Sequence, residues 1–227
     1  WLASAPASVA DDTDGASGQE PLEIAVTSGS TGDPKGVLHV HDTGLATVQS
    51  TIRRQGIRAD DVVHLAIPVG HTFGYFYGVR CAFQARGTLV LQERWDARRM
   101  LELVRAHGVT VSLGPSAFLL DLLNLSPSES AALSGIRLFT HSGDSLAAPT
   151  MRRAMETFPF RISRALGMTE FGHAVSTDAA TPIERNVDSV GTPQPEIELR
   201  IVDHAGHPVA AGVEGRILVR GAIVFAG

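Results

Sequence analysis

Short apolar runs alternate with amphipathic stretches along most of this chain, and this alternation limits its fold more than any other feature. The apolar runs predict β-strands at residues 23–27, 36–41, 62–67, 88–91, 109–113, 136–140 and 161–164. Helices are expected at residues 42–55, 74–85, 96–107, 115–124 and 149–158, the first of them capped by Asp42 and ended by Gly56. Repeated strand–helix units predict an α/β fold, in which a mainly parallel sheet is flanked by helices on both faces.

The two ends of the chain depart from this pattern. Residues 1–20 are rich in Ala, Ser, Asp and Gly without periodicity, which is typical of a flexible segment. After residue 171 prolines interrupt the chain, and residues 197–203 and 216–220 alternate by twos, which favours antiparallel strands. We therefore expect a flexible segment at 1–20, an α/β unit at 21–171 and a β-rich segment at 172–227.

The composition excludes several classes of protein. With 44% hydrophobic and 19% charged residues the chain is an ordinary globular sequence, and its net charge of −5 gives no footprint for nucleic acid. No apolar run reaches the roughly 20 residues of a membrane span, and no signal-peptide pattern is seen at the start. The lone cysteine, Cys81, is expected to be a buried thiol and fits a reducing cytoplasm.

Lys35 is the only lysine among the 19 basic residues, so it is not there as general surface charge. It belongs to the Gly/Ser/Thr-rich run 27–36, which follows the apolar strand 23–27. Glycine lets a backbone approach a ligand closely, and backbone N–H groups, hydroxyls and an ammonium cradle phosphate oxygens. The run is not the P-loop of NTPases, because that pattern requires Gly-Lys-Ser/Thr and Lys35 lies between Pro34 and Gly36.

At every position, residues 27–36 resemble the phosphate-binding loop of the acyl-adenylate-forming enzymes, the AMP-dependent synthetases and ligases that include acyl-CoA synthetases. A second motif, Leu166 to Glu170, resembles the aromatic-Gly-x-Thr-Glu signature of this family. There the threonine contacts phosphate and the glutamate helps hold Mg²⁺. Leu166 departs from the pattern, since the family usually has an aromatic residue that stacks on adenine.

Two weaker blocks lie between these motifs in the family's order. Residues 68–74 resemble the segment in which a histidine or aromatic residue lines the acyl pocket, and residues 141–145 resemble a Gly-rich turn whose backbone lies along adenine. In open α/β sheets, ligands bind beyond the carboxyl ends of the strands. Since each of the four segments follows a predicted strand, all four are expected at the same edge. The resemblance covers residues 20–227, and 172–227 would belong to the family's barrel-like β subdomain.

The resemblance implies a complete set of site residues. Lys35, His71, Thr169 and Glu170 would be catalytic, with Glu170 holding Mg²⁺. The substrate pocket would contain His71, Phe73, Gly167 and His173, although His173 reads equally well as a plain loop residue. The implied ATP contacts are Thr27, Ser28, Gly29, Ser30, Thr31, Gly32, Lys35, Ser142, Gly143, Asp144, Leu166, Gly167, Met168 and Thr169.

The implied activity is that of an ATP-dependent carboxylic acid–CoA ligase, which makes acyl-AMP and pyrophosphate and then transfers the acyl group to CoA. The local sequence is closest to synthetases for medium-chain, alicyclic or aromatic acids. The chain would be a fragment of the large N-terminal domain, without the ribose-binding Asp and the C-terminal domain, and is expected to turn over little alone. One alternative is an adenylating domain that loads a carrier-protein thiol. A non-catalytic nucleotide-binding module is another, supported only by Leu166.

Two groups of polar residues have simpler interpretations. His39 and His41 share one face of a strand, but no third ligand follows at a usable spacing, so a zinc site is not favoured. The arginine pairs 53–54, 98–99 and 152–153 are expected on solvated helix exteriors, with a contact to a CoA phosphate as a minor alternative.

Overall fold

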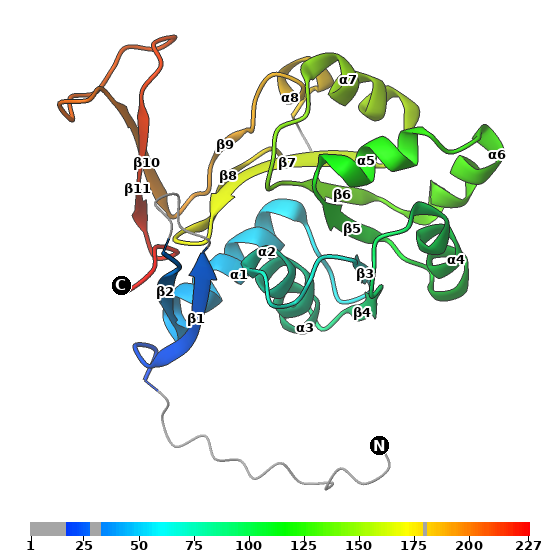
Figure 1. The fold of residues 1–227 in the computed structure, drawn as a ribbon, viewed down its shortest axis with the longest axis horizontal. Helices are drawn as coiled ribbons and strands as arrows, with labels where there is room; N and C mark the ends of the chain where they lie inside the picture. Colours follow the sequence, from blue (N-terminus) through cyan, green and yellow to red (C-terminus); the bar gives the residue numbers. More distant parts are fainter. Residues whose placement is uncertain (1–16, 28–32, 179–180) are drawn as a thin grey trace, which may run out of the picture.

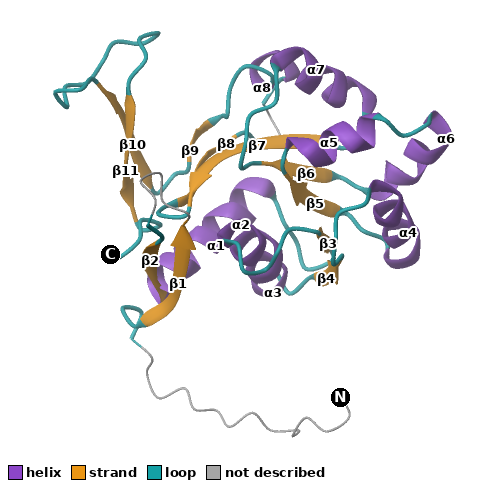
Figure 2. Cartoon of the chain, viewed as in Figure 1, coloured by secondary structure: helices purple, strands orange, loops and turns teal. Residues whose placement is uncertain are grey.

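A seven-stranded sheet in the order β4-β3-β5-β6-β7-β8-β9 forms the centre of the computed structural model, which describes residues 17–27, 33–178 and 181–227 (Figures 1 and 2). Strands β3 to β7 pair in parallel, whereas β8 and β9 are added antiparallel. The strands are β3 (Val62–Leu65), β4 (Thr88–Leu91), β5 (Val111–Gly114), β6 (Leu138–His141), β7 (Arg161–Met168), β8 (Gly172–Ser176) and β9 (Thr192–Pro193). The predicted α/β class is therefore confirmed.

Helices cover both faces of the sheet, as predicted (Figure 1). The main ones are α1 (His41–Gln55), α4 (Ala97–His107), α5 (Ser116–Leu123) and α7 (Ala148–Thr157). The shorter ones are α2 (Thr72–Gly74), α3 (Cys81–Gln84), α6 (Pro127–Ser130), α8 (Ile183–Asn186), a π-helix (Tyr75–Arg80) and a 3-10 helix (Ala131–Gly135).

The core lies in two layers, one on each side of the sheet. Met100, Leu119 and Met151, from α4, α5 and α7, pack in one layer. Val48 of α1 and Phe76 of the π-helix pack in the other. Along each strand the side chains alternate between the two layers, because successive residues of a strand face opposite ways.

The strand that precedes the predicted phosphate loop is not part of this sheet, which corrects the prediction of one shared sheet edge. β1 (Pro21–Thr27) pairs antiparallel with β2 (Lys35–Val40) in a separate two-stranded sheet. The seven residues 28–34 between them are too few for the crossover of a dozen or more that parallel pairing needs. The predicted loop residues Ser28, Gly29, Ser30, Thr31 and Gly32 lie outside the described residues.

Two helix predictions need correction. Asp42 does not cap α1; Val40 does, because its N–H and carbonyl both bond the hydroxyl of Thr43. The Asp42 carboxylate instead accepts from the Gln19 side chain at 2.9 Å. The nearly continuous apolar character of residues 74–85 predicts a buried helix, but Phe83 in this stretch is 72% exposed. Cys81 in the same stretch is buried, and burial raises the pKa of its thiol to about 12.

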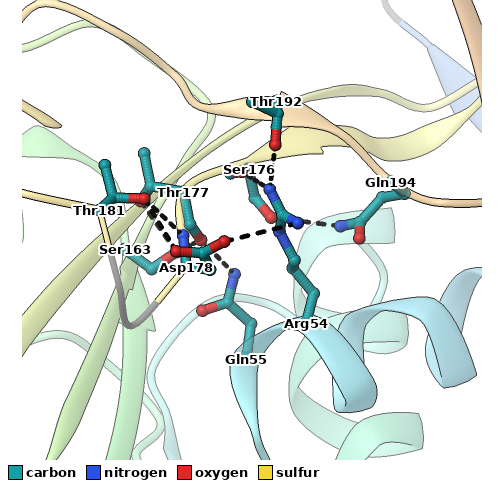
Figure 3. A network of polar contacts seen from close by, with 9 residues as sticks. All are labelled: Arg54, Gln55, Ser163, Ser176, Thr177, Asp178, Thr181, Thr192 and Gln194. Atoms are coloured by element: carbon teal, nitrogen blue, oxygen red, sulfur yellow. Dashed lines mark hydrogen bonds and ion pairs between the residues drawn. The ribbon is translucent and has the colours of Figure 1, made fainter. Parts of the chain in front are cut away.

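The prediction that Arg54 lies on a solvated helix exterior also needs correction, because its side chain is mostly buried. Its guanidinium donates to the carbonyl of Ser176 at 2.9 Å and to the hydroxyl of Thr192, and it pairs with Asp178 at 3.6 Å (Figure 3). These contacts tie the last turn of α1 to strands β8 and β9. Its neighbour Arg53 is exposed, as predicted, and pairs with Glu196.

The C-terminal part of the chain is antiparallel, as the alternating pattern predicts. β10 (Ile197–Val202) and β11 (Arg216–Gly221) form a two-stranded sheet of their own. The last residues return to β2, where the Ala226 N–H donates to the carbonyl of Leu38 and the Leu38 N–H donates to that of Gly227.

Candidate active site

A cavity of about 460 Å³ lies where the β1–β2 hairpin meets the carboxyl ends of β3 and β6 and the turn between β7 and β8. It brings together residues from all four segments predicted from the sequence. Its lining is Thr27, Lys35, His71, Thr72, Phe73, Tyr77, Ser142, Gly143, Gly167, Met168, Thr169, Glu170, Gly172 and His173. Of these, Thr72, Tyr77 and Gly172 were not predicted.

The hairpin of β7 and β8 shapes one wall, and two of its residues must be glycine. A Cβ on Gly167 would lie 2.2 Å from the carbonyl oxygen of Gly172. Gly172 has a φ of +56°, and a Cβ there would lie 2.5 Å from the Tyr77 hydroxyl. Strand β7 runs to Met168, beyond the predicted end at residue 164, so only Thr169, Glu170 and Phe171 form the turn.

His71 is the N-cap residue of the short helix α2, and the backbone of that helix holds its ring. Its Nδ1 accepts from the Phe73 N–H at 3.1 Å. Nδ1 therefore carries a lone pair, and the proton of the neutral imidazole sits on Nε2. Nε2–H can then donate to an anionic oxygen in the cavity.

His173 and Tyr77 close the cavity with a stacked pair of rings. Their centroids are 3.6 Å apart, the planes differ by 6°, and the Tyr77 hydroxyl accepts from the backbone N–H of His173. Burial lowers the pKa of His173 to about 3, so this ring is neutral near pH 7. Tyr77 lies four residues after Phe73 on the same helical run, and that spacing was the sequence signal that could have found it.

Because His173 is held neutral, the chain should lose stability in mild acid. In the unfolded chain the imidazole of His173 is protonated below about pH 6.5, whereas in the folded chain it is protonated only near pH 3. The folded state therefore keeps its full stability above pH 6.5 and loses free energy of unfolding as the pH falls below that value. Between pH 7 and pH 5 the loss at this one site is about 2 kcal/mol. His173→Phe, which keeps an aromatic ring on Tyr77, should reduce the acid loss measured by urea unfolding. Replacing the exposed His204 with Gln should leave the acid-dependent loss of stability unchanged. If wild type and His173→Phe lose the same free energy of unfolding between pH 7 and pH 5, His173 is not its source.

Leu166 and Asp144 lie in a neighbouring hollow of about 220 Å³, which shares Gly143 and Gly167 with the cavity. The Asp144 carboxylate accepts from the backbone N–H and the hydroxyl of Ser116, each at 2.9 Å, and lies 3.2 Å from Nε2 of His141. Its side chain therefore pins this loop to the first turn of α5. Gly143 of this loop and Leu166 both line the hollow.

A third hollow, of about 380 Å³, adjoins His71 and is mostly apolar. It shares His71, Phe73, Ser142 and Gly143 with the cavity. The remainder of its lining is Ala66, Ile67, Pro68, Trp95, Pro115 and Phe118. Trp95 and Phe118 stack there with centroids 3.7 Å apart.

The model of one protein family, the AMP-binding enzymes, matches residues 3–227, which is almost the whole chain. The chain belongs to this family. Among curated relatives, it is 29% identical to the medium-chain fatty-acid–CoA ligase of Escherichia coli K12, over 92% of this chain and 37% of the relative. It is 30% identical to the 4-hydroxybenzoate–CoA/benzoate–CoA ligase of Rhodopseudomonas palustris, over 88% of this chain and 37% of the relative.

Solved structures of AMP-binding enzymes share the fold. ATP-bound MatB from Rhodopseudomonas palustris superposes with a TM-score of 0.86 at 28% identity, over 93% of this chain and 42% of that one. The O-succinylbenzoate CoA synthetase MenE of Bacillus subtilis, solved with ATP and a magnesium ion, gives a TM-score of 0.78 at 25% identity, over 90% of this chain and 42% of that one. The chain spans between 37% and 43% of the length of the curated relatives it matches. Within the described residues, every helix is too short or too polar to cross a membrane.

Proposed function

We propose that this AMP-binding chain supplies the ATP site of an acid–CoA ligase, which activates a carboxylic acid as acyl-AMP and passes the acyl group to CoA. The observation that carries the proposal is the cavity itself. Lys35, His71, Thr169 and Glu170 come from three separate stretches of the sequence and all face one space. A lysine and a threonine for phosphate, a carboxylate for a metal ion and a histidine for the acid are the groups that this reaction needs.

In the first step, an oxygen of the acid carboxylate attacks the α-phosphorus of ATP, and the bond from that phosphorus to the bridging oxygen of pyrophosphate breaks. The catalytic task of the protein is to align the two anions and neutralise their charge. Lys35 and Thr27 would hold the departing phosphates, and the Thr169 hydroxyl would donate to the α-phosphate. Nε2–H of His71 would orient the acid. In the second step the thiol of CoA attacks the acyl carbon and AMP departs.

The residues present fit a magnesium ion bound together with ATP. Among the described residues no three His, Cys, Asp or Glu side chains converge, so a metal held by protein alone is not seen there. Glu170 is the one carboxylate in the described lining of the cavity. Mg²⁺ is commonly held by one or two carboxylates plus phosphate oxygens, which is what Glu170 and ATP together offer. When bound, the ion neutralises phosphate charge.

The tail of the acid should be apolar and uncharged. Apart from Lys35, assigned to phosphate, the described lining of the cavity has no Lys or Arg, and His173 is neutral. The adjoining apolar hollow offers room for a medium-chain, alicyclic or aromatic tail. A second carboxylate would meet no cation there and would lose its hydration without compensation.

Three further assignments remain proposals. Residues 21–171 would form the nucleotide-binding unit and 172–227 the start of a β-rich subdomain, although the β7–β8 hairpin runs across that boundary. The protein would act in the cytoplasm and serve the metabolism of fatty or aromatic acids. CoA is the proposed thiol, and a carrier protein is the alternative.

The thiol acceptor is tested in the full-length protein that carries this chain. It is incubated with ATP, Mg²⁺ and matched acids such as octanoate and its dicarboxylate suberate, first alone and then with CoA. We expect acyl-CoA from the monocarboxylate and little from the dicarboxylate. Acyl-AMP that forms but never passes to CoA would exclude CoA as the acceptor, and efficient use of suberate would contradict the uncharged tail.

A further inference from the structure

His39 is buried beside the candidate site, and the reaction proposed above gives it no role. Its Nε2 lies 2.7 Å from the carbonyl oxygen of Thr169, although the two residues are 130 positions apart in the sequence. His39 belongs to β2, four residues after Lys35, and Thr169 begins the β7–β8 turn. The contact therefore joins the strand that carries the phosphate-binding lysine to the turn that carries the Thr-Glu motif.

The direction of this hydrogen bond is fixed by chemistry. A carbonyl oxygen can only accept, so Nε2 of His39 must donate. The ring cannot easily turn away, because it is 1% exposed and the edge of Phe76 packs against it at 5.3 Å between centroids. Its other nitrogen, Nδ1, lies 3.4 Å from the hydroxyl of Thr43 at the start of α1. His39 is thus a fixed donor aimed at the back of the turn.

The β7–β8 turn lines the cavity and is held in place by hydrogen bonds to two of its backbone carbonyls. Thr169 and Glu170 both line the cavity. On the other side, His39 donates to the Thr169 carbonyl, and the Phe225 N–H donates to the Glu170 carbonyl at 2.8 Å. Loss of the His39 donor would leave a carbonyl without its buried partner and free the turn to rotate.

We propose that His39 is a positioning residue, which sets Thr169 and Glu170 at the correct distance from Lys35. The role rests on the proposed acyl-adenylate activity. His39 touches neither acid nor ATP; it acts through the backbone of Thr169. Its loss should therefore affect the use of MgATP and leave the binding of the acid nearly unchanged.

Two amide substitutions separate this role from simple core packing. In His39→Gln the amide nitrogen can reach the place of Nε2 and donate to Thr169. In His39→Asn it reaches only the place of Nδ1, near Thr43. In the full-length protein, we expect His39→Asn to raise the KM for MgATP and lower kcat, about tenfold in kcat/KM, while the KM for the acid changes less than about twofold. His39→Gln should return to within about threefold of wild type.

Equal impairment of the two variants, or a loss that falls on the KM of the acid, would overturn the proposal. Hydrogen exchange of a peptide covering residues 168–172 tests the positioning role of His39 without any turnover. If the wild-type protein were inactive, that result would count against the proposed function and not against this role. The amides of this peptide should exchange faster in His39→Asn than in His39→Gln. The same exchange rate in both variants, with the rest of the chain unaffected, would overturn the positioning role.

Discussion

Replacing Lys35 with alanine should slow pyrophosphate release by about two to three orders of magnitude in the full-length protein. In the proposed reaction the Lys35 ammonium would compensate negative charge that grows on the leaving pyrophosphate, and no other lysine or arginine lines the described part of the cavity. Because the side chain is exposed at the start of β2, its removal should change the free energy of unfolding by no more than about 0.5 kcal/mol.

The matched variant is Lys35→Arg, which keeps the charge but changes its shape. It should retain more activity than Lys35→Ala, since most of the effect is electrostatic, yet less than wild type because a planar guanidinium cannot replace a compact ammonium. Pyrophosphate release is followed with a coupled assay at saturating acid, alongside urea unfolding of each variant. A rate in Lys35→Ala equal to that of wild type would remove Lys35 from the mechanism.

Glu170→Gln should slow the same reaction by about two orders of magnitude and move its magnesium dependence to higher concentrations. The amide keeps the size of the side chain but removes the negative charge that holds a hard cation. The measurement is a titration of pyrophosphate release with MgCl₂ at fixed ATP.

The control for this variant is Glu156→Gln, an exposed carboxylate on α7 that does not line the cavity. It should follow the wild-type magnesium curve. A Glu170→Gln curve that superposes on the wild-type curve would show that Glu170 does not hold the ion.

The central sheet could be predicted because its strands are short apolar runs with polar or glycine punctuation. The run 88–91 matches β4 at both ends, and the predicted helix 96–107 is α4, with Asp96 as its N-cap residue. Pairing is harder to predict, because it depends on partners far apart in the sequence. For that reason β1 was expected in the main sheet, although it pairs only with β2.

The candidate site could be predicted where residues belong to contiguous motifs, such as Gly167 to Glu170. The remainder depends on side chains that approach from other elements. Tyr77 and His39 belong to none of the predicted motifs, and only the folded chain shows that one stacks on His173 and the other contacts Thr169. Asp144 illustrates the reverse case, since it belongs to a predicted motif but its half-exposed carboxylate also bonds Ser116, a contact that the motif does not predict.

The most direct test of the central claim is acid-dependent exchange of labelled pyrophosphate into ATP by the full-length protein, with Mg²⁺ and without CoA. Exchange requires that acyl-AMP and pyrophosphate form reversibly in one site, so it isolates the step assigned to Lys35, Thr169 and Glu170. We predict exchange that appears only when a monocarboxylic acid with an apolar tail is added. If no label enters ATP with any acid tested, although the protein still binds ATP, the account is contradicted. The site would then bind nucleotide without activating an acid.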